Sequence, residues 1–302
     1  MINLKTALPV VLIFLNFMLH GQEVSEGPVK NVRVNDIYLQ ASFYFVENTY
    51  RTPDVFSALA PGSTLLKSDF TGFSETNESI VLPHKMFSAL AGIDFANKEK
   101  TDYRSSPQLR LGISYFSGGL LSSGMNRRDY IVYDTITSSR TGKSFTTDSV
   151  IYRSFSMRYK TDQLRLDASL IFKTRPWALF SLFAGFGFTS GFSVQNMTTI
   201  SYFERGSLED SWLYSRYFDG APTFSSFDYY REEETFSNQP NISFSAYFPM
   251  GINLRPGSKE GIFKNVRIFY EFRPGLFLTS VPETGTIKRR ALQHGIGLRT
   301  AI

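Results

Sequence analysis

The 302-residue chain contains no cysteine. This absence excludes disulfide bonds, thiol nucleophiles, cysteine-based metal sites and a lipid anchor on an N-terminal cysteine. An exported protein without such cross-links needs another source of rigidity, and a closed ladder of backbone hydrogen bonds is one such source.

A long apolar run is also missing after the first 21 residues. Residues 1–21 combine Lys5, an apolar stretch from Ala7 to Leu19 and the small residue Gly21, the pattern of a cleaved signal peptide. The stretch is shorter than the roughly 20 residues that a membrane-spanning helix needs. We therefore expect a signal peptide in residues 1–21, a periplasmic segment in residues 22–33, and a membrane domain of β-strands in residues 34–302.

The chain has little excess of charge of either sign. The formal net charge is +5, from 32 basic and 27 acidic residues, and no basic tract suggests a nucleic-acid partner. Aromatic residues (16%) and 22 glycines are abundant, as expected for strands joined by turns. The mean hydropathy of −0.15 is compatible with a membrane barrel, because only alternate strand residues face lipid.

Apolar and polar residues alternate in eight segments of the chain. Their lengths suit tilted membrane strands better than ordinary soluble strands. The segments are residues 36–45, 86–96, 108–117, 163–173, 177–188, 241–254, 265–278 and 291–302. The pattern predicts an all-β fold, a transmembrane antiparallel up-and-down β-barrel of about eight strands.

The connections between these segments alternate between long and short. About 40, 45 and 50 residues follow the first, third and fifth segments, whereas short links follow the second, fourth and sixth, and about a dozen residues precede the last. Long extracellular loops and short periplasmic turns are typical of outer-membrane barrels. An even number of strands would place both chain ends on the periplasmic side.

The same alternation could also build a soluble sandwich or a lipocalin-like barrel, with the bulky face turned inward. The face opposite the bulky residues favours the membrane barrel, because it carries charges of both signs in mid-strand. We expect these charges to form a structural network in the lumen, since eight strands leave room only for side chains; a narrow channel is the alternative. The residues are Arg110, Arg165, Asp167, Arg267, Glu271, Arg273 and Arg299.

The third long loop, residues 189–240, is unusually aromatic. Protein interfaces favour aromatic residues and arginine, so the loop is a candidate partner site; alternatively, it continues the flanking strands and packs on itself. The candidates are Tyr202, Phe203, Trp212, Tyr214, Tyr217, Phe218, Tyr229 and Tyr230.

The second long loop carries basic residues that we expect outside the bilayer, where lipopolysaccharide phosphates would pair with them. They are Arg127, Arg128, Arg140, Lys143, Arg153 and Arg158.

Three segments resemble the small outer-membrane β-barrel proteins of Bacteroidota, the PorT-like group with an outer membrane protein beta-barrel domain. They are LRLDASLIFK at residues 164–173, LFAGFGF at residues 182–188 and HGIGLR at residues 294–299. The resemblance implies an outer-membrane location and insertion by the barrel-assembly machinery through the last strand, and it implies no activity. The chain departs from the pattern by ending in Ala301-Ile302, where such barrels commonly end on an aromatic residue.

Histidine is scarce, which argues against catalysis. Of three histidines, His20 lies in the signal segment and His294 shares the lipid-facing parity of the last strand, leaving only His84 near the outer rim. A hydrolytic triad needs a histidine oriented by a carboxylate, and zinc sites need several close ligands. We expect no cofactor, no metal and no enzyme, but an envelope structural or interaction protein that acts through its outer loops, with outer-membrane lipid and another outer-membrane protein as partners. The alternatives are a pore and, less favoured, a lipid- or peptide-modifying enzyme.

Overall fold

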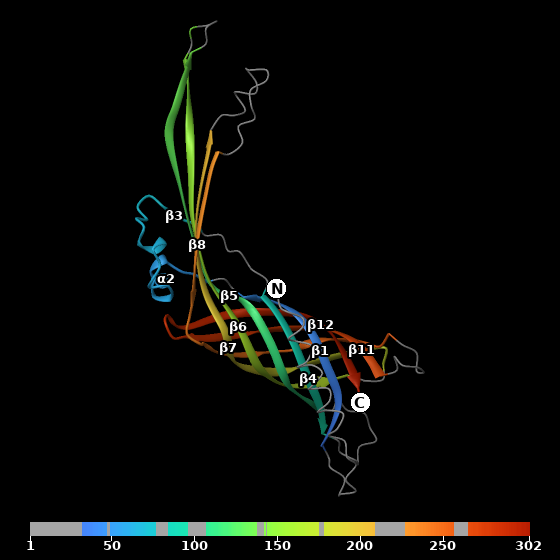
Figure 1. Cartoon of the computed structure of the whole chain (residues 1–302). Helices are drawn as coiled ribbons and strands as arrows, with labels where there is room; N and C mark the ends of the chain where they lie inside the picture. Colours follow the sequence, from blue (N-terminus) through green and yellow to red (C-terminus); the bar gives the residue numbers. More distant parts are fainter. Residues whose placement is uncertain are drawn as a thin grey trace.

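The computed structural model describes residues 32–46, 49–76, 84–95, 107–137, 142, 144–174, 178–208, 227–256 and 265–302. These residues form one 12-stranded sheet, and eight positions around it close into a ring (Figure 1). The main strands are β1 (Val32–Val46), β4 (His84–Phe95), β5 (Pro107–Thr137), β6 (Ser144–Lys173), β7 (Phe180–Leu208), β8 (Phe227–Ser237), β9 (Ile242–Tyr247), β10 (Met250–Leu254), β11 (Val266–Val281) and β12 (Gly285–Ala301).

Neighbouring strands of the ring are antiparallel and follow the order of the chain. β1 pairs with both β4 and β12, which closes the barrel. β9 and β10 together fill one position, because each pairs with β7 on one side and β11 on the other. The eight predicted segments correspond one to one to the eight positions of the ring, and the predicted up-and-down antiparallel barrel is confirmed.

The two faces of the barrel wall have opposite chemistry. Outward side chains are large and apolar, and Leu166 is 66% exposed. Inward side chains alternate with them and are buried polar or charged groups, for example Glu271 and Arg110 at 0% exposure. Such an apolar outer wall is stable only in a hydrocarbon surrounding, because exposing so many large apolar side chains to water is unfavourable. The ring is therefore a transmembrane β-barrel of the outer-membrane type.

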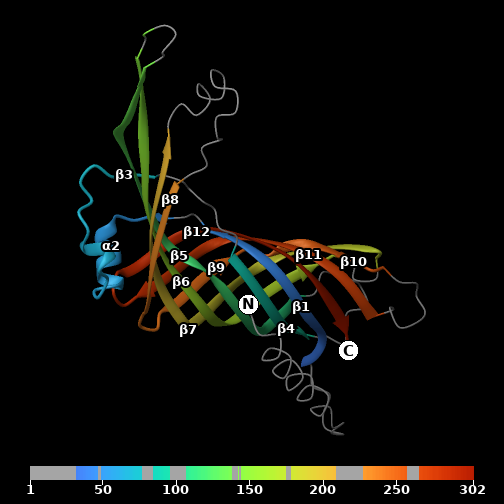
Figure 2. The same cartoon turned by 45° about the horizontal axis from the view of Figure 1, so that its top comes forward.

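Three strands are much longer than predicted. β5, β6 and β7 continue past the barrel rim, where the sequence suggested loops, and with β8 they form an extracellular sheet of residues 121–137, 144–160, 196–208 and 227–237. The sequence pattern did not predict these extensions, because outward positions above the membrane meet water. They carry residues such as Ser122, Asn126 and Arg128 in place of Leu and Phe, so the apolar alternation is lost. In both views the sheet leaves the barrel at a steep angle (Figures 1 and 2).

The register shifts at the rim of the barrel on two of these strands. The β5–β6 pairing skips Leu120, and the β6–β7 pairing skips Val194. Such β-bulges bend a strand and strengthen its twist. They lie where the extracellular sheet turns away from the barrel.

The last hairpin also differs from the prediction. The expected loop of a dozen residues is a turn at residues 282–284, which Gly285 completes at a φ of 83° that favours glycine. The strands continue into the predicted loop with charged outward residues, Lys288 and Arg290, in place of apolar ones.

The first long connection, residues 49–76, forms a compact lid over the extracellular end of the barrel. It contains helix α2 (Pro53–Leu59), the 3-10 helix η1 (Leu65–Lys67), and the short strands β2 (Thr49–Tyr50) and β3 (Ser74–Glu75), both of which pair with β5. Pro53 starts α2, and Phe56 and Leu59 on its inner side are buried. The lid is fixed to the sheet along its length.

Residues 1–31, which include the expected signal peptide, lie outside the described residues, and β1 begins at Val32, within the segment expected to be periplasmic. No helix in the described part of the chain has the length and apolar character needed to span a membrane.

Candidate functional site

An ion-pair network crosses the lumen of the barrel. Glu271 on β11 accepts a hydrogen bond from Arg110 Nη1 on β5, on the opposite wall, at 2.5 Å. Arg273 binds Glu271 through Nε and Asp167 on β6 through Nη1, the latter at 2.8 Å. Tyr247 on β9 donates to the same Asp167. These bonds tie facing walls of the barrel directly to each other.

A second cluster lies nearer the periplasmic end and is centred on Asp36. Arg299 donates to both carboxylate oxygens of Asp36 at 2.8 Å, and Lys173 Nζ lies 3.2 Å away. Gln108 donates to Asp36 at 2.5 Å and accepts from Tyr38 at 2.5 Å. The cluster joins β1, β5, β6 and β12 across the lumen.

Arg165 lies above these clusters in an aromatic layer. Its guanidinium carbon lies 3.8 Å from the ring centroid of Phe116 and 4.7 Å from that of Phe277. Its Nε donates to Gln163 at 2.9 Å. Cation–π contacts and this hydrogen bond take the place of an ion pair, since no carboxylate within the described residues pairs with Arg165.

The structure places the predicted lumen residues as follows. Arg110, Arg165, Asp167, Glu271, Arg273 and Arg299 are buried inside the barrel, whereas Arg267 is only half-buried and forms none of these ion pairs. The spacing along the strands suggests two sets of partners, Arg165 with Asp167, and Glu271 with both Arg267 and Arg273. Glu271 does pair with Arg273, but its second partner is Arg110 in place of Arg267, and Asp167 pairs with Arg273 in place of Arg165. Sequence reasoning missed Asp36 and Lys173, although both share the inward parity of the strands that they border.

Side chains fill the lumen in the described part of the barrel. Glycines on the inner face make room for rings: a Cβ on Gly251 would lie 2.5 Å from the Phe183 ring, and one on Gly297 would lie 2.6 Å from the Phe269 ring. A cavity among Tyr44, Arg165, Tyr247 and their neighbours has a volume of about 10 Å³, space for about one water molecule.

The lid closes the extracellular end with an apolar cluster. Phe56, Leu59 and Leu65 of the lid are buried in one cluster with residues of the barrel mouth and of the extracellular sheet, among them Phe277, Val281, Ile287, Phe155 and Ile200. Desolvation of such a cluster stabilises the closed position.

One carboxylate fastens the lid to the sheet. Glu234 on β8 accepts hydrogen bonds from the backbone N–H of Thr64 at 3.0 Å, from the Thr64 hydroxyl at 2.5 Å and from the Ser63 hydroxyl. Partial burial raises the pKa of Glu234, but these hydrogen bonds outweigh it and hold the pKa below its ordinary value.

The basic residues of the second long connection lie on both faces of the extracellular sheet. Arg127 and Arg153 lie on the face that carries the lid, where they pair with Asp129, and Arg153 also pairs with Glu204 at 2.9 Å. Arg128 and Arg158 lie on the opposite face. Arg140 and Lys143 lie outside the described residues.

The aromatic candidates divide in the same way. Tyr202 packs on Phe155 at 4.8 Å and donates to Glu204, and burial followed by that bond raises its pKa to about 12. Phe203 is half-buried on the opposite face, and Tyr230 on β8 is exposed. β8 pairs with the extension of β7, in keeping with the expected alternative that the loop continues its strands. Outside the described residues lie Trp212, Tyr214, Tyr217, Phe218 and the side chain of Tyr229.

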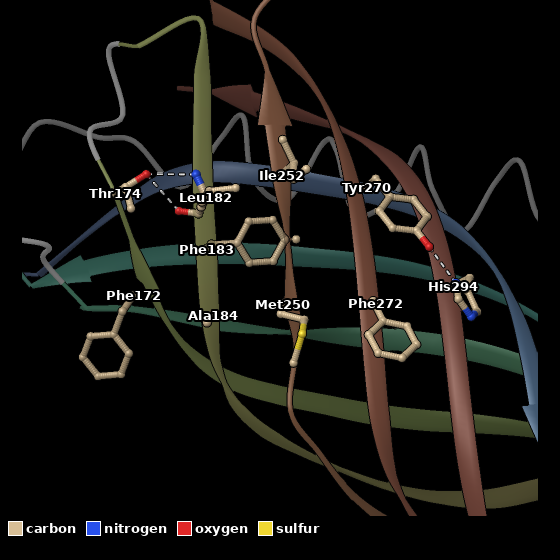
Figure 3. Close-up of a pocket in the computed structure, with 11 residues that line it drawn as sticks. Phe172, Thr174, Leu182, Phe183, Ala184, Met250, Ile252, Tyr270, Phe272 and His294 are labelled. Carbon is tan, nitrogen blue, oxygen red and sulfur yellow. Dashed lines mark hydrogen bonds between the residues drawn. The ribbon is translucent and has the colours of Figure 1, made fainter.

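A larger hollow lies on the lipid-facing wall and has a volume of about 730 Å³. Apolar residues such as Phe172, Leu182 and Met250 line it (Figure 3). Its polar contact is a 2.6 Å hydrogen bond between the Tyr270 hydroxyl and His294 Nδ1, which satisfies both groups within the membrane. The hollow suits an acyl chain better than a polar ligand. No group of three or more potential ligands for a metal ion occurs in the described part of the chain.

Comparison with known proteins gives only distant similarities. No protein-family profile matches the chain, and no curated protein sequence matches it. Among solved structures, Neisserial surface protein A is similar at 10% identity and a TM-score of 0.28, over 90% of this chain and 100% of that one. Ail of Yersinia pestis is similar at 10% identity and a TM-score of 0.26, over 88% and 99%. A BenF-like porin from Pseudomonas fluorescens Pf-5 reaches 7% identity and a TM-score of 0.18, over 91% and 100%. These scores are too low to support an inference, and the assignment as an outer-membrane barrel rests on the wall and lumen described above.

Replacing Glu271 with leucine tests the lumen network. The substitution leaves Arg110 buried without a carboxylate and leaves Arg273 with Asp167 alone, so we expect the barrel to lose about 3–5 kcal/mol of stability against unfolding. Urea unfolding followed by the gel shift of the folded barrel measures the loss. The double variant Arg110→Met/Glu271→Leu should recover part of it, because one stranded charge is gone. An unchanged stability of Glu271→Leu would contradict the inward assignment of β11.

The second prediction concerns the pH dependence of the lid. Because the pKa of Glu234 is lowered in the folded protein, its contribution is present above the ordinary glutamate range and is lost as the pH falls through the lowered value. A spin label on Ser57→Cys, exposed on α2, should gain mobility over that acid range, measured by electron paramagnetic resonance. The same label in Glu234→Gln should show no such transition. An identical transition in both proteins would show that another group controls the lid.

Proposed function

We propose that this protein is a non-enzymatic, non-conducting outer-membrane anchor that presents its extracellular sheet to a protein partner, as an accessory or structural subunit of the envelope. The observation that carries the proposal is the filled barrel: ion pairs cross the lumen, an aromatic layer lies above them, and the lid closes the mouth. A barrel closed in this way offers its outer surface for function, and the largest structure on that surface is the extracellular sheet.

The edges of the extracellular sheet support a protein partner. After Asn126, where its short contact with β3 ends, β5 pairs only with β6 within the described residues. In the same part of the chain, β8 pairs only with β7. Open strand edges bind extended segments by adding a strand to the sheet. Tyr130, Ile131 and Tyr230 are exposed on these two edge strands and supply the apolar contact that interfaces favour.

Two alternatives receive less support. A pore requires a continuous path, which the lumen network and the lid oppose. An enzyme requires an oriented base, but His84 is buried inside the barrel mouth, where it stacks on Phe116 at 5.5 Å. Membership of the PorT-like group of Bacteroidota, and insertion by the barrel-assembly machinery, remain part of the proposal and rest on the three resembling segments.

A crosslinking experiment in cells of the source organism tests the proposal. A photo-crosslinking amino acid at Ile131, exposed on the edge strand β5, should give one discrete protein adduct. The same amino acid at Leu278, exposed on the lipid-facing wall, is the matched control and should give none. The purified protein should give no stepwise currents in planar bilayers. Stepwise currents, or no adduct from Ile131, would contradict the proposal.

A further inference from the structure

The face of the extracellular sheet opposite the lid, here called the outer face, continues the lipid-facing wall of the barrel. The unpaired residues at the rim belong to β5 and β7 and not to β6, so the even-numbered residues of β6 stay outward from Leu166 and Leu164 up to Arg158 and Tyr152. The bulges at Leu120 and Val194 change the parity of β5 and β7, and even residues of β5 and odd residues of β7 then share this face. One surface therefore runs from the membrane onto the sheet.

The outer face has an excess of cations. Its described ionisable side chains are Arg128, Arg158, Lys160, Arg205 and Arg231 with Asp162 and Glu233. The two acids pair with Lys160 at 3.6 Å and Arg231 at 2.6 Å. Arg128, Arg158 and Arg205 form no ion pair with any described carboxylate. On the lid face, in contrast, Arg127 and Arg153 are paired with acids.

Two of these arginines flank one tyrosine. Tyr152 lies directly opposite Arg128 on β5 and directly opposite Arg205 on β7. The Arg128 guanidinium carbon lies 4.4 Å from the Tyr152 ring centroid, which orients its fork of donors. Strands two positions apart are about 10 Å apart, so both long side chains can reach one phosphate between them. Arginine matches phosphate geometry with two parallel hydrogen bonds.

The tilt of the sheet brings this face toward the membrane. Eight residues separate Lys160, at the rim, from Tyr152, about 26 Å along a strand. If the sheet stood upright on the membrane, the distance from Arg128 and Arg205 to the membrane surface would be well above the Debye length of about 8 Å at physiological salt. The sheet instead leaves the barrel at a steep angle, and α2 lies on the side turned away from the barrel in both views (Figures 1 and 2). The outer face is thus turned to the side on which the membrane surface lies.

We propose that the outer face of the extracellular sheet binds phosphate groups of anionic lipids in the outer leaflet, with Arg128, Arg158 and Arg205 as the binding residues. Two properties of this face select lipid: it is continuous with the lipid-facing wall, and its charge is complementary to phosphate headgroups. Lipid binding holds the sheet over the membrane beside the barrel and leaves the lid face open to the outside. This proposal does not depend on a protein partner for the sheet.

The experiment uses the whole protein in vesicles and exploits the absence of cysteine. A fluorophore on Tyr130→Cys, exposed near Arg128, reports contact with a quencher attached to lipid headgroups. We expect stronger quenching in phosphatidylcholine vesicles that contain phosphatidylglycerol than in pure phosphatidylcholine vesicles, and reversal by 0.5 M NaCl, since salt screens the attraction (about 3 Å Debye length near 1 M).

The triple variant Arg128→Ser/Arg158→Ser/Arg205→Ser should lose this extra quenching. Each basic residue near an anionic surface contributes about fivefold to binding, so three contribute on the order of a hundredfold. The matched control Lys288→Ser/Arg290→Ser removes exposed cations from the barrel rim. This control should keep the extra quenching in vesicles that contain phosphatidylglycerol. A gel shift like that of the unsubstituted protein shows that each variant is folded.

Three outcomes would overturn the proposal. Equal quenching in the two kinds of vesicle would show that the face does not bind anionic lipid. Equal loss in the triple variant and the rim control would show that general charge, and not this face, is responsible. Competition by inorganic phosphate beyond that of NaCl at equal ionic strength would identify a site for free anions.

Discussion

The ion pair between Glu271 and Arg110 is the contact on which the rest of the structure depends, because it spans the lumen between opposite walls. Arg273 also binds Glu271 and extends the network to Asp167 on a third strand. Buried ions are costly to desolvate and are tolerated only when their charges and hydrogen bonds are met. The ion pairs of this lumen form only because the barrel is narrow and its walls are close together. The narrow lumen leaves no wide water-filled channel, and the pairs make the barrel rigid in a chain without disulfide bonds.

Because side chains fill the barrel, we propose that the protein acts through its outer surface. The long strands β5, β6 and β7 carry the wall beyond the membrane without a break in pairing, so the extracellular sheet is held by the barrel and not by a flexible loop. The lid fixes the sheet a second time through Glu234 and the apolar cluster around Phe56. The sheet then has three distinct surfaces: a face covered by the lid, a basic face that continues the lipid-facing wall, and open strand edges.

The barrel could be predicted from the sequence because lipid and lumen impose a strict alternation on every strand within the membrane. Leu164, Leu166 and Phe172 alternate with Arg165, Asp167 and Lys173, and the structure places the two sets on opposite faces. Pairings across the lumen could not be predicted, since which charges meet depends on strand tilt and register: Glu271 bonds Arg110 at a sequence separation of 161 residues. The sequence left open that the loop after β7 continues its strands, as β7 and β8 do. The extensions of β5 and β6 were missed because the faces of the extracellular sheet meet water or the lid, and neither face has to be apolar throughout.

Spin labels on the barrel wall test the central claim, that the bulky face contacts lipid and the charged face fills the lumen. Cysteines introduced at Leu111, Ala184 and Ile268, all on the outward side, would carry the only labels, because the chain has no cysteine of its own. In a membrane barrel, oxygen dissolved in lipid should relax the labels strongly, whereas a water-soluble nickel reagent should not reach them. Exclusion of both reagents would show that the residues form the core of a soluble protein and would contradict the account.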